Sequence, residues 1–232
     1  TIYIKPDGTI LPPTQLIQQN GNIYTLTSNI TSDADGIIIQ KNNMTLNGAG
    51  HVLQGSSIGI GISLDEANNV TIKNMEIKAF RDGISLYGSS NNNISKINIT
   101  ANKRFGIALS LSSNNSIVGN NITQGDSYGV YFDTSANNSI VGNSIINFND
   151  GIGLYSSSNS NITNNNITAN RYGIRVETSN NNIISENRLT EVGLFASTSY
   201  GNVVERNSVN NKPLVYLEGL ANYTVDDAGQ VI

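Results

Sequence analysis

Five side chains in the middle of the chain carry the groups that usually contact sugars: Tyr131, Asp133, Tyr155, Arg175 and Glu177. Aromatic rings stack on sugar faces, while carboxylates and guanidinium groups form hydrogen bonds with hydroxyls. The two acids lie two sequence repeats apart, so strands spaced by about 4.8 Å would separate them by about 10 Å. This slightly exceeds the roughly 6.5–9.5 Å of inverting glycosidases. The pattern favours an ordinary soluble strand face over sugar contact, and sugar contact over catalysis.

Other ionisable residues are less well placed for chemistry. Asp82 and Asp150 occupy equivalent repeat positions three repeats apart, roughly 14 Å, which is too far for two carboxylates to act together. The single histidine, His51, has no acid beside it in the sequence, which favours a structural or solvent-facing role over a general base. Three arginines precede repeat glycines by two residues and form an interrupted strip that weakly indicates anion binding: Arg81, Arg104 and Arg171.

A sequence repeat of about 22 residues positions these side chains. Each copy reads Gly, apolar, any residue, apolar, then a Ser/Asn-rich corner, then I-x-x-N-x-I. A single copy has too few apolar residues to bury its own face, so the copies must stack on one another. The copies begin 23, 23, 22, 22 and 20 residues apart, at Gly83, Gly106, Gly129, Gly151, Gly173 and Gly193.

The repeat predicts strands rather than helices. Apolar residues two apart, such as Ile107 and Leu109, share one face of a strand. Gly, Asn and Ser interrupt the Ile- and Val-rich segments every few residues, which leaves no room for a helix. We therefore expect an all-β parallel β-helix, or β-solenoid, with about 8 coils of about 22 residues. A leucine-rich repeat has a similar period, but its L-x-x-L-x-L opening and helix-forming segment are missing.

The two ends depart from the repeat, although the chain is expected to form a single domain. Residues 1–35 contain turn-forming Pro and Gly, and we expect them to cap a β-helix formed by residues 36–232. Residues 225–232 resemble residues 46–53, so the last coil, from about residue 215, is expected to be incomplete or open. An open end favours association of subunits into rings or fibres.

One polar column interrupts the apolar columns of the repeat. Asparagine recurs between two inward aliphatic residues, and stacked amides can satisfy one another by hydrogen bonding. This pattern predicts a structural asparagine ladder, formed by Asn120, Asn143, Asn165, Asn187 and Asn207.

Composition limits the partners. The net charge is −4, and 13% of the residues are charged without a Lys/Arg cluster, which argues against nucleic acid and anionic lipid. No apolar run reaches the roughly 20 residues of a membrane span. The start at Thr1 indicates a mature terminus after signal-peptide removal, or the boundary of a shorter piece.

Sequons favour an extracellular or cell-surface protein with N-glycosylation, although a chain rich in Asn, Ser and Thr also makes sequons by chance. N-x-S/T occurs at Asn29, Asn43, Asn69, Asn93, Asn98, Asn114, Asn121, Asn137, Asn161, Asn166 and Asn222.

The pattern G-I-x-L…S-x-N-N-x-I-x-x-N-x-I, seen in residues 83–207, resembles a known repeat. It is similar to the right-handed parallel β-helix repeat of NosD-like and carbohydrate-associated surface proteins. The opening, with YIKPDG at residues 3–8, resembles exported archaeal members, notably from methanogens. The resemblance implies the fold but no single activity, because this fold carries lyases, hydrolases, epimerases, adhesins and structural proteins.

The name NosD suggests copper delivery, but the ligands for a soft metal are scarce. The chain has one histidine, His51, two methionines, Met44 and Met75, and no cysteine. We therefore expect neither a metal nor a cofactor.

These observations favour a non-catalytic, exported structural β-solenoid that self-associates into a cell-surface layer, sheath or fibre. The alternative is a carbohydrate-binding module, or a polysaccharide lyase or hydrolase, that uses the outward Tyr/Asp/Glu/Arg face.

Overall fold

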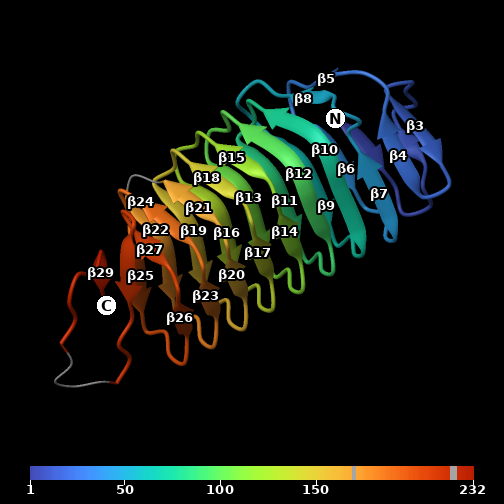
Figure 1. The fold of residues 1–232 in the computed structure, drawn as a ribbon. Coiled ribbons are helices and arrows are strands. Elements are labelled where there is room, and N and C mark those ends of the chain that lie inside the picture. Colours follow the sequence, from blue (N-terminus) through green and yellow to red (C-terminus); the bar gives the residue numbers. More distant parts are fainter. Residues whose placement is uncertain (169–170, 220–223) are drawn as a thin grey trace.

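The computed structural model describes residues 1–168, 171–219 and 224–232. Within these residues every regular element is a β-strand, and the strands stack as successive coils of one elongated solenoid, with the termini toward opposite ends (Figure 1). The predicted parallel β-helix is therefore confirmed. Among the described residues, no helix is long and apolar enough to cross a membrane.

One wall of the solenoid is a ten-stranded sheet, ordered β2-β1-β6-β9-β11-β13-β16-β19-β22-β25. Strands β1 and β2 pair antiparallel, and every other pair in the sheet is parallel. The strands are β1 (Ile2–Ile4), β2 (Ile10–Leu11), β6 (Ile37–Ile39), β9 (Ile60–Asp65), β11 (Asp82–Tyr87), β13 (Phe105–Ser110), β16 (Tyr128–Asp133), β19 (Asp150–Tyr155), β22 (Tyr172–Glu177) and β25 (Leu194–Ser197).

Two further walls close each coil. The second wall contains β4 (Ile23–Leu26), β7 (Met44–Asn47), β14 (Ser116–Val118), β17 (Ser139–Val141), β20 (Asn161–Thr163), β23 (Ile183–Ser185) and β26 (Val203–Glu205). The third contains β5 (Ile30–Thr31), β8 (Val52–Gln54), β15 (Asn121–Thr123), β18 (Ser144–Ile146), β21 (Asn166–Thr168), β24 (Arg188–Thr190) and β27 (Ser208–Val209). The longer strands β10 (Val70–Lys78) and β12 (Asn93–Thr100) run through both walls.

Each wall sends aliphatic side chains into a continuous core. In one coil Ile107, Ile117 and Ile122 come from the three walls, and all three are fully buried. The corners between walls use residues with positive φ, such as Asn114 at 58° and Asn137 at 57°. Asparagine tolerates this left-handed conformation better than most side chains. This requirement explains why the corners of the repeat are rich in Asn.

The predicted asparagine ladder is present inside the corner between the second and third walls. The backbone N–H and the Nδ2 group of Asn120 donate to Oδ1 of Asn143 at 2.9 and 3.0 Å. Asn143 donates in the same way to Asn165, at 2.9 and 3.0 Å. The chain of bonds continues through Asn187 to Asn207. All five amides are buried, so each bond replaces one that water would otherwise make.

Asn143→Ala is expected to lower the free energy of unfolding by about 1–3 kcal/mol. The substitution removes the acceptor of two Asn120 donors and the donor to the Ile117 carbonyl oxygen. Denaturant unfolding of the purified chain measures the loss. The exposed neighbour substitution Asn166→Ala is the control and should change stability little. Equal stability of the two variants would contradict a stabilising ladder.

Two further buried ladders lie at a neighbouring corner and were not predicted from the sequence. In one, each backbone N–H donates to the serine hydroxyl of the next coil, through Ser89, Ser112, Ser135, Ser157, Ser179 and Ser199. The other runs through Asn92, Asn115, Asn138, Ser160, Asn182 and Asn202. Their residues belong to the Ser/Asn-rich corner, whose composition resembles that of a solvated turn. Spacing alone does not show that these side chains point inward.

Residues 1–35, expected as a cap, contain a coil of their own. Strands β1, β4 and β5 pair parallel with β6, β7 and β8, while β3 (Ile17–Asn20) forms an antiparallel hairpin with β4. Tyr24, on β4, is fully buried and its hydroxyl donates to the Gly8 carbonyl oxygen at 3.0 Å. The first coil is thus covered by chain from the same segment.

The C-terminal segment, where the last coil was expected to be incomplete or open, folds back on the preceding coil. Strand β28 (Lys212–Val215) turns back to pair antiparallel with β27, and β29 (Gln230–Val231) pairs with β28. The Gln230 side chain accepts from the Leu194 N–H and donates to its carbonyl oxygen, both at 2.8 Å. These bonds occupy part of the last edge of the ten-stranded sheet. Self-association stays a prediction.

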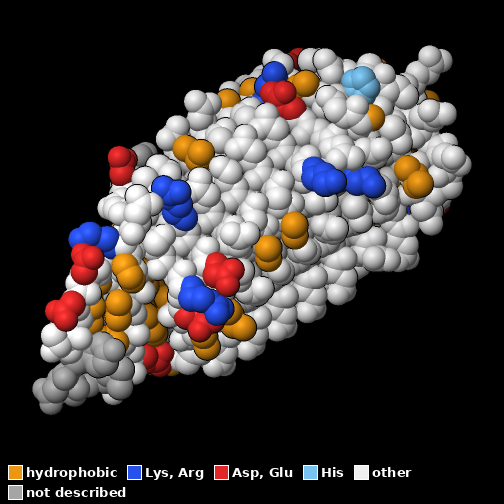
Figure 2. Space-filling view, viewed as in Figure 1, with side chains coloured by type: hydrophobic (Ala, Val, Ile, Leu, Met, Phe, Trp, Pro, Cys, Tyr) orange, Lys and Arg blue, Asp and Glu red, His pale blue; other side chains and the backbone are white. Residues whose placement is uncertain are grey.

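The sequon asparagines lie at the surface wherever they are described. Most are exposed, and Asn98 and Asn161 are half-buried; Asn222 lies outside the described residues. One face of the molecule is shown in Figure 2, where most of the surface is neither charged nor hydrophobic and charged side chains form small, separate groups. Glycosylation stays a prediction.

Candidate functional site

The five predicted sugar-contacting residues gather on the outward face of the ten-stranded sheet. The parallel register places Asp133, Tyr155 and Glu177 side by side on β16, β19 and β22. A second row places Tyr131 and Arg175 on either side of Gly153. All five side chains are half-buried, so each one both packs on the sheet and reaches solvent.

Phe105 and Tyr128 join Tyr131 and Tyr155 in an aromatic patch of four rings. Phe105 and Tyr131 stack with centroids 5.0 Å apart and an interplanar angle of 1°. Tyr131 lies 5.1 Å from Tyr128 and 5.4 Å from Tyr155. Gly153 makes room for this arrangement, because a Cβ there would stand 2.6 Å from Cε1 of Tyr128. The patch is therefore a continuous aromatic surface across β13, β16 and β19.

Arg175 connects the patch to a second pair of rings. Its guanidinium lies 5.6 Å from the centroid of Tyr155, and it contacts Tyr172 and Phe195 at 5.5 and 5.6 Å. Its Nε donates to Oε1 of Glu177 at 2.6 Å. The ring contacts and the bond to Glu177 together restrict the Arg175 guanidinium. It therefore lies over the outward face of the sheet rather than free in solvent.

The tyrosine hydroxyls of the patch are neutral hydrogen-bonding groups. Tyr128 and Tyr155 share a hydrogen bond of 2.6 Å between their hydroxyl oxygens. Burial raises the pKa of Tyr128, and the bond to Tyr155 and the nearby Asp150 charge raise it further. Burial also raises the pKa of Tyr131 and of Tyr155. These hydroxyls therefore stay protonated at neutral pH, where they can donate a proton or a hydrogen bond but cannot act as bases.

Two buried aspartates lie beneath the edge of this face and hold its arginines. Asp150 is fully buried. Arg171 donates to its two carboxylate oxygens, from Nε to Oδ1 at 2.9 Å and from Nη2 to Oδ2 at 2.8 Å. Asp82 is 1% exposed and accepts from Arg104 at 2.8 and 2.7 Å and from Arg81 at 3.1 Å. The bond to Asp82 raises the pKa of Arg104. The arginine strip expected from the sequence is thus bound to Asp82 and Asp150, the two aspartates that lie too far apart to act as a catalytic pair.

The sequence analysis missed Phe105, Tyr128, Tyr172 and Phe195 as members of the face. Phe105, Tyr128 and Tyr172 occupy the position just before a repeat glycine, which none of the predicted residues occupies, while Phe195 lies in register with Arg175 on the next coil. Their common signal is an aromatic residue one position before, or two after, a repeat glycine, and this signal could have identified them.

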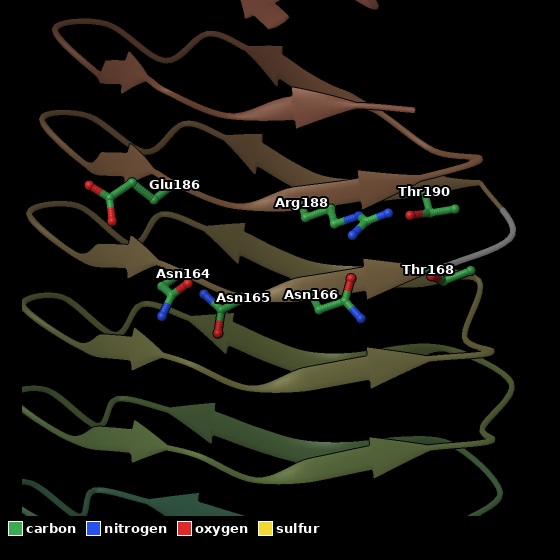
Figure 3. A pocket seen from close by; sticks show the side chains of 7 residues that line it. All are labelled: Asn164, Asn165, Asn166, Thr168, Glu186, Arg188 and Thr190. Atoms are coloured by element: carbon green, nitrogen blue, oxygen red, sulfur yellow. The ribbon is translucent and has the colours of Figure 1, made fainter. Parts of the chain in front are cut away.

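A different hollow, of about 500 Å³, lies between two coils on the third wall, beside its corner with the second wall. Figure 3 shows Glu186, Arg188 and Thr190 on one coil, facing Asn164, Asn166 and Thr168 on the coil before it. Asn165 belongs to the asparagine ladder. Only polar side chains line this hollow, so it lacks a ring on which a sugar could stack.

The chain matches the family described as periplasmic copper-binding protein (NosD), in two overlapping ranges, residues 4–152 and 58–227. The chain belongs to the NosD family. Its own residues do not fit the copper of that description. His51 is the only histidine, cysteine is absent, and Met44 and Met75 lie in the core at 3% and 4% exposure. Among the described residues, no group of three His, Cys, Asp or Glu side chains could hold a metal ion.

Solved structures with the fold of this NosD-family chain include proteins named for their action on carbohydrates. The periplasmic alginate epimerase AlgG aligns with a TM-score of 0.68 and 20% identity, over 75% of this chain and 47% of that one. The mannuronan C-5 epimerase AlgE6 A-module from Azotobacter vinelandii gives 0.65 and 16%, over 80% and 58%. The catalytic domain of a GH87 α-1,3-glucanase gives 0.57 and 15%, over 84% and 48%. The chain thus spans about half the length of these proteins, and no curated protein matches it by sequence.

These structures correct the prediction that the chain is not an enzyme. That prediction relied on an uninterrupted ladder and on the absence of a close pair of carboxylates. Epimerases and a glucanase have the same fold, so a regular β-helix is no argument against catalysis.

Proposed function

We propose that the protein binds a polysaccharide across the outward face of the ten-stranded sheet. The observation that carries the proposal is the aromatic patch of Phe105, Tyr128, Tyr131 and Tyr155, half-exposed on three adjacent strands. Aromatic rings on a flat sheet match the apolar faces of sugar rings, and each stacked ring contributes both contact area and orientation.

Polar groups around the patch supply the hydrogen bonds that a sugar needs. Asp133 stands at the end of β16, and within the described residues its carboxylate has one side-chain partner, the Thr134 hydroxyl at 3.1 Å. Arg175 and Glu177 lie two strands further along the sheet. Rings in the centre with acids and a guanidinium beside them are the usual composition of a carbohydrate site.

Export to a compartment that contains polysaccharides supports the same proposal. The family description is that of a periplasmic protein, and the described sequons lie at the surface. A structural role in a surface layer, sheath or fibre stays a prediction, and it does not use the aromatic patch.

Tyr155→Ala is expected to weaken polysaccharide binding by about tenfold or more, because aromatic anchors dominate binding energy in such contacts. Calorimetric titration against a panel of acidic and neutral polysaccharides measures the affinity. Tyr155→Phe keeps the ring and removes only the hydroxyl that meets Tyr128, so it separates stacking from hydrogen bonding. Tyr200→Ala, at an exposed tyrosine on another part of the surface, is the matched control.

Binding that is unchanged in Tyr155→Ala and in Tyr131→Ala would remove this face as the site. The absence of binding across the whole panel would contradict the proposed function. The same mixtures are followed for changes in the length and structure of the polysaccharide, because epimerases and a glucanase share this fold.

A further inference from the structure

A cationic groove of about 450 Å³ opens beside the aromatic patch. It lies at the corner that leads into strands β9, β11, β13 and β16, and its lining comes from successive coils. The lining residues are Ser57, Ile58, Gly59, Arg81, Lys103, Arg104 and Asp126. Three of these side chains are cations and one is an acid.

Cations outnumber acids among the residues that line the groove. Arg81 and Arg104 share one buried carboxylate, that of Asp82. No carboxylate of the described residues lies within ion-pair distance of Lys103. The lining residues together with Asp82 thus carry three cations and two acids, and a third acid, Asp35, lies beside Gly59 and accepts from the Ile60 N–H at 2.7 Å, in a chain whose net charge is −4. Because Lys103 has no such partner, the groove offers a local site for an anion on an acidic protein.

The guanidinium groups are held in place before any ligand arrives. Arg104 uses Nε and Nη2 to bind Asp82, and within the described residues its Nη1 has no protein acceptor. Its guanidinium carbon lies 4.3 Å from the centroid of the Phe105 ring. Because these contacts fix the side chain, an anion that binds to its remaining N–H groups does not have to order it.

Phe105 makes the groove continuous with the aromatic patch. The Phe105 ring contacts the Arg104 guanidinium, and it also stacks on the Tyr131 ring with their centroids 5.0 Å apart. A sugar that packs against the solvent-facing edges of Phe105 and Tyr131 would therefore place its acidic substituent, or that of the next sugar, toward Arg104 and Lys103. Ile58, which is 55% exposed, offers an apolar rim to the same sugar.

We infer that the polysaccharide is anionic, and that one of its carboxylate or sulfate groups occupies the groove formed by Arg81, Lys103 and Arg104. This inference rests on the proposed function, because the groove alone has too little aromatic surface to hold a neutral chain. Carboxylate and sulfate share the charge and the acceptor oxygens that guanidinium groups recognise.

The test compares chains that differ only in charge. Homogalacturonan with free carboxylates is compared with its methyl ester, and dextran sulfate with dextran, by calorimetric titration at low and high salt. We expect the charged member of at least one pair to bind roughly tenfold more tightly at low salt, with the preference reduced at high salt. The pair that shows the preference tells carboxylate from sulfate.

Lys103→Gln isolates the groove without disturbing the buried aspartates, since Lys103 is exposed and takes no part in the Asp82 ion pairs. It should reduce the preference for the charged chain several-fold and leave affinity for the neutral chain unchanged. Lys96→Gln, at an exposed lysine on β12, is the matched control and should change neither.

Each outcome separates the inference from the proposed function. Equal binding of charged and neutral chains, lost in Tyr155→Ala, would overturn the anionic ligand and keep the polysaccharide site. A charge preference that Lys103→Gln and Lys96→Gln reduce equally would overturn the groove as its source. If none of these four polysaccharides binds, and none of the wider polysaccharide panel binds either, both the inference and the proposed function would be overturned.

Discussion

Gly151→Val is expected to prevent the β-helix from folding, with a loss of stability of about 5 kcal/mol or more. Gly151 opens a coil at a point where the chain passes close to the next coil. A Cβ there would stand 2.5 Å from the carbonyl oxygen of Gly173 and would also meet the Ile167 side chain. The carbonyl belongs to backbone that is hydrogen-bonded in the sheet, so it cannot move aside without breaking the register of two coils.

Circular dichroism and thermal unfolding of the purified variant measure this effect. Gly142→Asn is the matched control, because Gly142 lies at an open corner with φ +65° and nothing within 4 Å of a Cβ. Asn164 occupies the equivalent corner one coil later with φ 56°, so asparagine fits this conformation. A Gly151→Val protein that unfolds at the temperature of the control would show that the coils can separate locally at little cost.

The close packing of successive coils also explains why so much of the fold could be predicted from the sequence. Each coil needs glycine at the entry to the sheet, aliphatic residues on three walls and residues tolerant of positive φ at the corners. These requirements recur every 22 or so residues, and the repeat of Gly83 to Gly193 therefore predicts the β-helix and the ladder through Asn143. The serine ladder through Ser135 was missed because inward and outward polar residues of a corner have the same composition.

The sequence predicted which residues of the candidate site lie at equivalent positions on successive coils. It did not predict contacts between residues at different positions of the repeat. Asp133, Tyr155 and Glu177 were placed correctly relative to one another, since strands in parallel register bring equivalent residues together. The stacking of Phe105 on Tyr131 joins different columns on successive coils, and it depends on side-chain directions that spacing does not specify. The burial of Asp150 under Arg171 is hidden for the same reason.

Arg171→Gln is expected to cost on the order of 3 kcal/mol, because it leaves a buried carboxylate without its main partner. Asp150 is fully buried, and among the described residues its remaining cationic partner would be Arg175, whose Nη1 lies 3.6 Å from Oδ2. Arg175 would then move toward Asp150 and away from Glu177 and the rings around Tyr155. We therefore expect weaker polysaccharide binding as well as lower stability, measured by denaturant unfolding and by titration.

The double variant Arg171→Gln with Asp150→Asn tests the cause, because it removes the charge that the first substitution strands. It should recover a large part of the lost stability, and a double variant no more stable than Arg171→Gln would contradict the explanation. Arg206→Gln is the matched control, since its partners Glu186 and Glu205 have side chains that are 51% and 49% exposed. Loss of those ion pairs should cost less than about 1 kcal/mol. Arg171 contacts both oxygens of one buried carboxylate, whereas Arg206 contacts two exposed carboxylates. A larger loss in Arg171→Gln would therefore show that burial of the partner, rather than the number of ion pairs, determines what an arginine contributes to stability.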